Sequence, residues 1–208
     1  MRYLIFPLLL VASCASTSPA VISDNSGAAN EPIEIALSLY IVDETDDSNS
    51  DLSSQRDVAG VEQIVERIQA IWRPAGIEFS IAAISRVDAS TEMLSSLASG
   101  ETGGFLNGLY NGSVALPKVS AINGFYVRSL GTINGIAPLG SGVFFVTDEP
   151  SVHDERVSSH EIGHILGLHH AIDDSNRLMF SGTNGMDLVE AEISVARYNA
   201  EGIASGAR

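Results

Sequence analysis

The sequence predicts one α+β domain in which helices pack against a β-sheet. Three stretches of apolar residues lead to this fold class. Large apolar side chains alternate with smaller or polar ones from Ile33 to Val42, recur at three- and four-residue steps from Val61 to Trp72, and alternate again from Ile77 to Ala82. A period of two is typical of a strand, and a period near 3.6 is typical of a helix. Because a helix joins the two strands, we expect them to be parallel.

Length and composition fit a single domain with a substantial core. The chain has 208 residues, of which 45% are hydrophobic and 18% are charged, and it is too short for two ordinary domains. The net charge is -15, and Lys118 is the only lysine. An acidic surface repels a phosphate backbone, so we expect no nucleic-acid partner.

Further elements follow along the chain. The first helix must end at Arg73-Pro74, because proline cannot continue a helix. The 88–118 stretch is rich in Ser, Gly, Asn and Thr and favours only a short helix around Glu92 to Ala98. Strands are predicted at Ala121 to Val127 and at Ser141 to Thr147, and the continuous apolar run in the second indicates burial on both faces.

Two segments leave alternatives open. Residues 131–140 contain several glycines and Pro138, which suit an edge strand or a rim loop and would weaken a central strand. The acidic run from Asp43 to Asp51 could form a calcium loop. It lacks the glycine and the distal glutamate of an EF-hand, so we favour a solvated loop.

The N-terminus resembles a bacterial lipoprotein signal peptide, residues 1–13. Its apolar run from Leu4 to Val11 is too short to span a bilayer as a helix. Directly after it, Val11-Ala12-Ser13-Cys14 resembles a lipobox, in which the cysteine is diacylated and becomes the new N-terminus. The alternative is an ordinary cleaved export signal. Cys14 is the only cysteine, so no internal disulfide can account for it.

Lipidation of Cys14 would make residues 14–32 a flexible tether and residues 33–208 the folded domain. The tether has few large apolar side chains to offset the entropy of ordering. Ala15 gives no acidic signal for inner-membrane retention. We therefore expect the protein in the bacterial cell envelope, at the outer membrane, in contact with the membrane only through its lipid anchor.

The strongest chemical signal is the pentapeptide His160-Glu161-Ile162-Gly163-His164. Histidines four residues apart lie on one face of a helix, one turn apart, where both can reach a single metal ion. A nitrogen-rich site with an open coordination position suits a catalytic Zn²⁺ ion. Glu161, next to the first histidine, can deprotonate a metal-bound water.

The chain continues to Gly167 and His170, so residues 160–170 match HExxHxxGxxH and resemble the long motif of the metzincin zinc endopeptidases. Gly167 can adopt the positive φ that turns the chain, which lets His170 become the third zinc ligand. His153 and His169 are less favoured as zinc ligands. Both are expected at the surface, with His153 on the same helix before the motif.

Two further segments extend the metzincin resemblance over most of residues 33–200. The sequence around Met179, from Asn176 to Phe180, resembles the Met-turn that places a methionine beneath the zinc site. Asp187 to Glu190 has the form of a capping box before a C-terminal helix. The resemblance implies a zincin-type catalytic domain with a mixed twisted sheet, an active-site helix, a Met-turn and a C-terminal helix. Matrixins look like the nearest branch.

This resemblance implies a monomeric endopeptidase that uses one Zn²⁺ ion and acts on a protein or peptide substrate. Glu161 would activate a zinc-bound water for attack on the peptide bond, and Ser181 to Met186 would wall the pocket for the side chain after the cut. The substrate would lie along an edge segment that contributes Gly135, Ile136, Ala137 and Leu139.

Two features depart from the family pattern, and two other functions remain open. No propeptide cysteine and no tyrosine shortly after Met179 is present.

One alternative function is a non-catalytic zinc- or peptide-binding envelope lipoprotein on the same fold, and the other is a structural envelope protein with a vestigial site. Retention of Glu161 argues against the first, because zinc binding alone requires no general base.

Cys14→Ser tests the lipobox. We expect the native chain to incorporate labelled fatty acid and the variant to remain an unprocessed, unlipidated precursor, because serine offers no thiol for acylation. Metabolic labelling and membrane fractionation measure the difference. Equal labelling of both chains would contradict the assignment.

Overall fold

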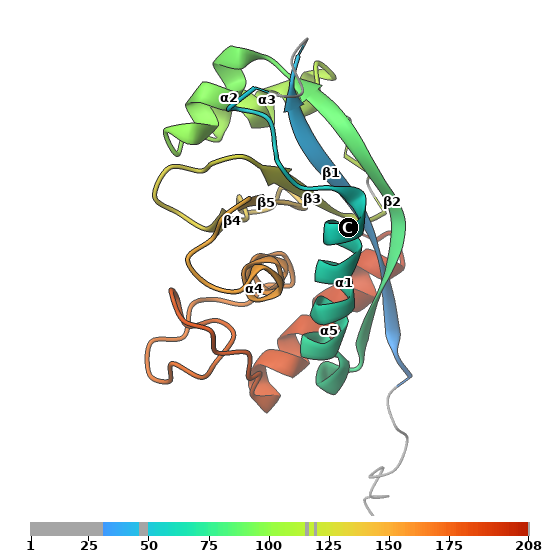
Figure 1. The fold of residues 1–208 in the computed structure, drawn as a ribbon. Coiled ribbons are helices and arrows are strands. Elements are labelled where there is room, and N and C mark those ends of the chain that lie inside the picture. Colours follow the sequence, from blue (N-terminus) through green and yellow to red (C-terminus); the bar gives the residue numbers. More distant parts are fainter. Residues whose placement is uncertain (1–30, 46–49, 115–116, 119, 208) are drawn as a thin grey trace, which may run out of the picture.

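The computed structural model describes residues 31–45, 50–114, 117–118 and 120–207. Its centre is a mixed five-stranded sheet with the strand order β2-β1-β3-β5-β4 (Figure 1). The first four strands in this order pair in parallel, and β4 pairs antiparallel to β5. The strands are β1 (Ile33–Glu44), β2 (Ile77–Ala89), β3 (Ile122–Val127), β4 (Gly135–Ile136) and β5 (Val143–Thr147).

Helices cover both faces of this sheet, as Figure 1 shows. Three of them, α1, α4 and α5, share one hydrophobic core with β1. The two shorter helices, α2 and α3, belong to a second core on the opposite face. The helices are α1 (Val58–Trp72), the 3-10 turn η1 (Arg73–Ala75), α2 (Thr91–Ala98), α3 (Gly103–Asn111), α4 (Asp154–Ile165) and α5 (Glu190–Ala204).

The alternation in β1 explains why two cores form. Leu37 and Leu39 point into the core under α1, α4 and α5, whereas Tyr40 and Val42 point into the core under α2 and α3. Successive side chains of a strand face opposite sides, so one apolar strand can supply both cores. Phe125 of β3 stacks on Tyr40 with ring centroids 4.7 Å apart in the second core.

The predicted strand-helix-strand crossover is confirmed. Asp57 caps α1 by accepting a hydrogen bond from the N–H of Gly60 at 2.7 Å, and Gly76 ends the connection with a φ of 62°. The two strands then pair in parallel from Ile33↔Ile77 onwards. The second strand runs to Ala89, further than its alternation predicted.

A glutamine of α1 occupies part of the free edge of β2. The main-chain N–H of Phe79 donates to Oε1 of Gln69 at 3.0 Å, and Nε2 of Gln69 donates to the carbonyl oxygen of Phe79. Both main-chain groups of Phe79 that face away from β1 are therefore satisfied by a side chain of the same molecule.

Two differences from the sequence prediction have clear physical reasons. Helix α3 was not predicted, because three glycines lower its intrinsic helix propensity. Burial of Phe105 and Leu109 in the second core stabilises it instead. The prediction of a capping box that begins at Asp187 is wrong. Val189 is the N-cap of α5, and its N–H donates to Oε2 of Glu192 at 3.0 Å.

An ionic network holds the start of α4 against the sheet. Arg56 donates to the carboxylate of Asp154 at 2.7 Å and to the carbonyl oxygens of Thr147 and Asp148 at 3.0 and 2.8 Å. The guanidinium also lies 5.3 Å from the ring centroid of Tyr126. The side chain of Asp148 is only 3% exposed, and desolvation raises the pKa of its carboxyl although hydrogen bonds and Arg56 lower it.

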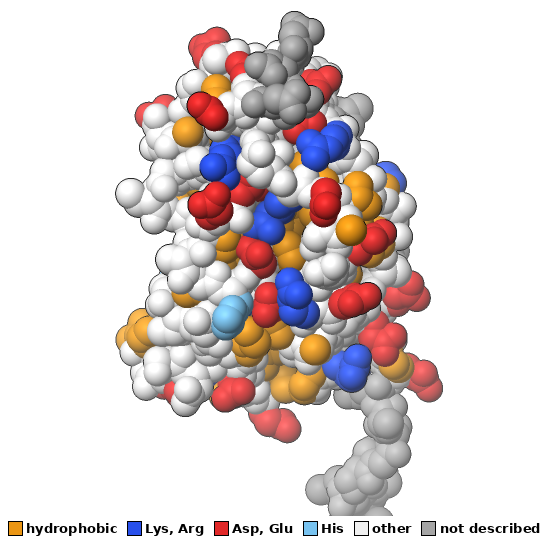
Figure 2. Space-filling view, viewed as in Figure 1, with side chains coloured by type: hydrophobic (Ala, Val, Ile, Leu, Met, Phe, Trp, Pro, Cys, Tyr) orange, Lys and Arg blue, Asp and Glu red, His pale blue; other side chains and the backbone are white. Residues whose placement is uncertain are grey.

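The outer surface carries charges of both signs. On the face in Figure 2, Lys and Arg side chains lie singly among Asp and Glu side chains and do not gather into one basic patch. In the described part of the chain, no helix combines the length and apolar character needed to cross a membrane. The residues expected to form the signal peptide lie outside the described residues, as do Cys14 and nearly all of the expected tether.

Arg56→Met tests the ionic network. We expect the free energy of unfolding to fall by about 3 kcal/mol, because the variant leaves the buried carboxylate of Asp148 without its main cation, Arg56. Urea denaturation followed by circular dichroism measures this change. Arg67→Met is the control, because its ion pair with Glu155 is half exposed and should contribute less than about 1 kcal/mol. Equal losses for the two variants would contradict the assigned role.

Candidate metal centre

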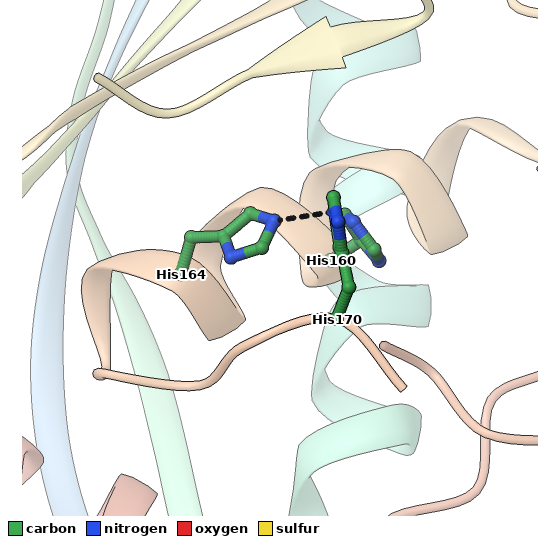
Figure 3. A group of neighbouring side chains, drawn as sticks. All are labelled: His160, His164 and His170. Carbon is green, nitrogen blue, oxygen red and sulfur yellow. Dashed lines mark hydrogen bonds between the residues drawn. The ribbon is translucent and has the colours of Figure 1, made fainter. Parts of the chain in front are cut away.

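Helix α4 and the turn after it bring three histidines together. His160 and His164 lie four residues apart on α4. Beyond its end, Gly167 adopts a φ of 84°, as predicted, and the chain turns back towards the helix. Figure 3 shows the ring of His170 on this returning segment, next to the rings of both helical histidines.

The histidine rings converge on one point. One ring nitrogen from each of His160, His164 and His170 lies within 4.8 Å of the others, and the Nε2 atoms of His164 and His170 are 3.1 Å apart. Two nitrogens of a tetrahedral zinc site are separated by about 3.3 Å. The described residues contain no other such group of histidine, cysteine or acidic side chains.

Two carbonyl oxygens orient the helical imidazoles. Nδ1 of His160 lies 2.8 Å from the carbonyl oxygen of Leu178, and Nδ1 of His164 lies 2.9 Å from that of Leu168. A carbonyl oxygen only accepts, so Nδ1 carries the proton in each ring and the Nε2 lone pair is left for a metal ion. This tautomer suits a zinc ligand that binds through Nε2.

Burial keeps these two rings neutral. Desolvation lowers the pKa of His160 to about 4, against the opposing effect of its hydrogen bond to Leu178. Desolvation likewise lowers the pKa of His164. Both rings therefore lack the second proton at neutral pH, and a metal ion does not have to displace it. The donor set and its geometry fit Zn²⁺, with the fourth position left for water or substrate.

Glu161 lies beside this centre and is 6% exposed. Burial raises the pKa of its carboxyl to about 8, while the positive charge of Arg156 and a hydrogen bond from the N–H of Ala137 lower it. A bound cation would favour the ionised form further. A carboxylate in this position can accept a proton close to the metal.

Edge strand β4 passes directly over Glu161. A Cβ atom on Gly135 would lie 3.0 Å from Oε1 of Glu161 and 2.7 Å from Cγ1 of Val157. Glycine is thus required for this close approach. The other expected substrate-binding residues follow along the same edge, from Ile136, which pairs with Phe145, to the almost fully exposed Leu139.

The segment around Met179 lies beneath the histidines. A Cβ atom on Gly163 would lie 2.6 Å from Sδ of Met179, so the helix admits the methionine only because residue 163 has no side chain. The carbonyl oxygen of Met179 accepts a hydrogen bond from the N–H of Ala171 at 2.9 Å. This bond fixes the chain immediately after His170.

Two residues at the site escaped the sequence analysis. Arg156 is buried and donates to the carbonyl oxygens of Leu178 and Phe180. Asn199 of α5 donates to the carbonyl oxygen of Leu166 at 3.0 Å, which satisfies the end of α4. The only signal for Arg156 was its spacing, one helical turn before His160 on the same face.

The remaining predicted residues lie at the margin of the centre. His153 and His169 are exposed, as predicted, but His153 is the N-cap of α4 and not part of the helix. The 181–186 loop lies against this helix start, where Oδ1 of Asn184 accepts from the N–H of His153 at 2.9 Å.

Solved structures of known proteins resemble this fold. Archaemetzincin from Methanopyrus kandleri is similar in structure, with a TM-score of 0.56 and 14% sequence identity over 81% of this chain and 96% of that chain. Metalloproteinase-II from Bacteroides fragilis matches with a TM-score of 0.48 and 18% identity over 83% of this chain and 55% of that chain. No family model and no curated protein matches the sequence. The chain therefore has a mixed, archaemetzincin-like fold, and a relation to matrixins stays a prediction.

Gly163→Val tests the packing beneath the histidines. We expect the free energy of unfolding to fall by about 2 kcal/mol, because the new side chain meets Met179 in a filled core. Thermal and urea denaturation measure the loss. Gly202→Val in α5 is the control, because nothing lies within 4 Å of a Cβ atom there. A similar response to both substitutions would rule out the close contact as the cause.

Proposed function

We propose that this protein is a zinc-dependent endopeptidase. The observation that carries the proposal is the buried carboxylate of Glu161 next to three histidine nitrogens that converge on one point. Metal binding alone would need the histidines and not the acid. The structural similarity to archaemetzincin supports the same proposal, because the two chains share a fold.

The residues divide the chemistry between them. His160, His164 and His170 would hold the ion. A bound Zn²⁺ ion supplies a Lewis acid, which lowers the pKa of water and polarises a carbonyl group. Glu161 accepts the proton that the attacking water loses and holds it on a carboxylate oxygen. The water oxygen bonds to the carbonyl carbon, the C–N bond breaks, and Glu161 returns the proton to the leaving amine.

Gly135 and the residues after it would bind the substrate main chain. An extended peptide can pair with an exposed strand edge, and β4 is the edge strand of this sheet. Because residue 135 has no side chain, β4 lies close to Glu161, and a peptide paired with this edge would lie near that carboxyl group. The N–H of Ala137 is directed to Glu161, so pairing would use the other main-chain groups of the edge. The 181–186 loop would contact the side chain after the cut.

The cellular setting is also a proposal. A lipid on Cys14 would anchor a monomeric enzyme in the bacterial envelope, at the outer membrane. The substrate would be an extended stretch of a protein or peptide, since the main chain of β4 makes no demand on side-chain identity.

Glu161→Gln separates catalysis from metal binding. We expect it to bind about one zinc ion per chain and to lose nearly all proteolysis, because the histidines remain and the proton acceptor does not. Metal analysis and cleavage of denatured casein measure the two properties. Cleavage at the native rate would show that the assigned mechanism is wrong.

His164→Ala is the matched loss-of-metal variant. It should lose both zinc and activity, because one of three nitrogens is missing. Chelation of the native enzyme should abolish cleavage, and added zinc should restore it. A native protein that binds zinc and cleaves neither casein nor a peptide library would favour the non-catalytic zinc- or peptide-binding protein.

A further inference from the structure

We propose that Arg156 is a positioning residue for the metal centre, and that it acts through the carbonyl oxygen of Leu178. This inference rests on the proposed zinc site. The hydrogen bonds of the Arg156 side chain to other described residues go to carbonyl oxygens and not to a histidine or to Glu161. Its role would be to fix the turn that orients His160 and restrains His170.

The contacts of Arg156 are directed at this turn. The side chain lies one helical turn before His160 and is 3% exposed. Its Nη2 atom donates to the carbonyl oxygen of Leu178 at 2.8 Å and also to that of Phe180. The carbonyl oxygens on both sides of Met179 are therefore held by one guanidinium group, whose planar shape suits two acceptors.

The Leu178 carbonyl oxygen links Arg156 to the imidazole. It accepts from Nδ1 of His160 and from Nη2 of Arg156, each at 2.8 Å. A carbonyl oxygen has two lone pairs, so these two donors saturate it and fix its direction. The direction of the carbonyl fixes the ring of His160, and the ring fixes where Nε2 points.

The same turn also reaches the third histidine. The carbonyl oxygen of Met179 accepts from the N–H of Ala171, the residue after His170, at 2.9 Å. Three consecutive carbonyl groups of the turn, residues 178–180, are thus engaged by Arg156, His160 or Ala171. Movement of the turn would disturb two of the three ligands.

The charge of Arg156 acts against zinc binding, so the effect of the charge and the effect of positioning predict opposite results when Arg156 is replaced. A buried guanidinium costs desolvation, and Nε of Arg156 is buried without a hydrogen-bond partner among the described residues. A cation near the centre also repels Zn²⁺. If charge dominated, removal of Arg156 would tighten zinc binding. If positioning dominates, as we propose, removal weakens it.

Arg156→Met and Arg156→Lys test the inference in the full chain. Methionine removes both the charge and the hydrogen bonds, and lysine keeps the charge but loses the planar fork. We expect the zinc dissociation constant to rise about 10–100-fold for Arg156→Met and by a smaller factor for Arg156→Lys. Competition with a chromophoric chelator measures it. Unchanged or tighter zinc binding by Arg156→Met would overturn the proposal.

Arg177→Met and Arg177→Lys are the matched controls. Arg177 lies in the same segment, but its side chain pairs with Asp173 and Glu192 at 3.0 and 2.7 Å and not with a carbonyl oxygen of the turn. We expect these controls to keep the native zinc affinity, even where they lower stability without metal. An equal loss of zinc affinity in both pairs would overturn the proposal, because general destabilisation would then explain it.

The spectrum of the imidazole protons gives a second readout. In the zinc-loaded native protein the Nδ1 proton of His160 should be protected from exchange by the Leu178 carbonyl oxygen, and Arg156→Lys should expose it more than Arg177→Lys does. If Arg156→Met does not fold, the two lysine variants decide the outcome. Failure of the native protein to bind zinc would instead reject the proposed function itself.

Discussion

A metal site made of imidazoles depends on where each ring points, and here main-chain carbonyl groups decide that direction. Leu178 and Leu168 accept the Nδ1 protons of His160 and His164, so both rings present Nε2 inwards. Both acceptors come from chain that follows the helix. The ligands of α4 are therefore not oriented by the helix alone, and the centre exists only when the chain has reversed at Gly167 and passed beneath the helix again.

The rest of the fold secures this reversal. Hydrogen bonds from Arg56 link the start of α4 to the chain after β5, and a hydrogen bond from Asn199 links the other end of α4 to α5. Between these points the helix lies on the parallel part of the sheet, with β4 close enough that only glycine fits at residue 135. The result is a buried Glu161 carboxyl group next to neutral histidines, where a divalent cation would find nitrogen ligands and would itself favour ionisation of the carboxyl group.

Different parts of the structure could be predicted to different degrees. The spacing of residues 160–170 predicted which histidines converge, because helix geometry and one glycine determine their placement. Helix α3 could not be predicted, since its glycine-rich sequence is helical only against the packed sheet. Arg156 was missed for a related reason. A sequence pattern does not show whether an arginine is buried or which carbonyl oxygens surround it, and residues 178–180 are distant in sequence.

Gln69 has a consequence for the behaviour of the protein at high concentration. A sheet with a free outer strand can act as a template on which further chains add, one strand at a time. In this molecule a newcomer at the Phe79 position of β2 would first have to displace an amide that already makes both main-chain hydrogen bonds. At this position the glutamine side chain takes the place of a neighbouring strand and presents no further strand edge, which disfavours the addition of another chain there.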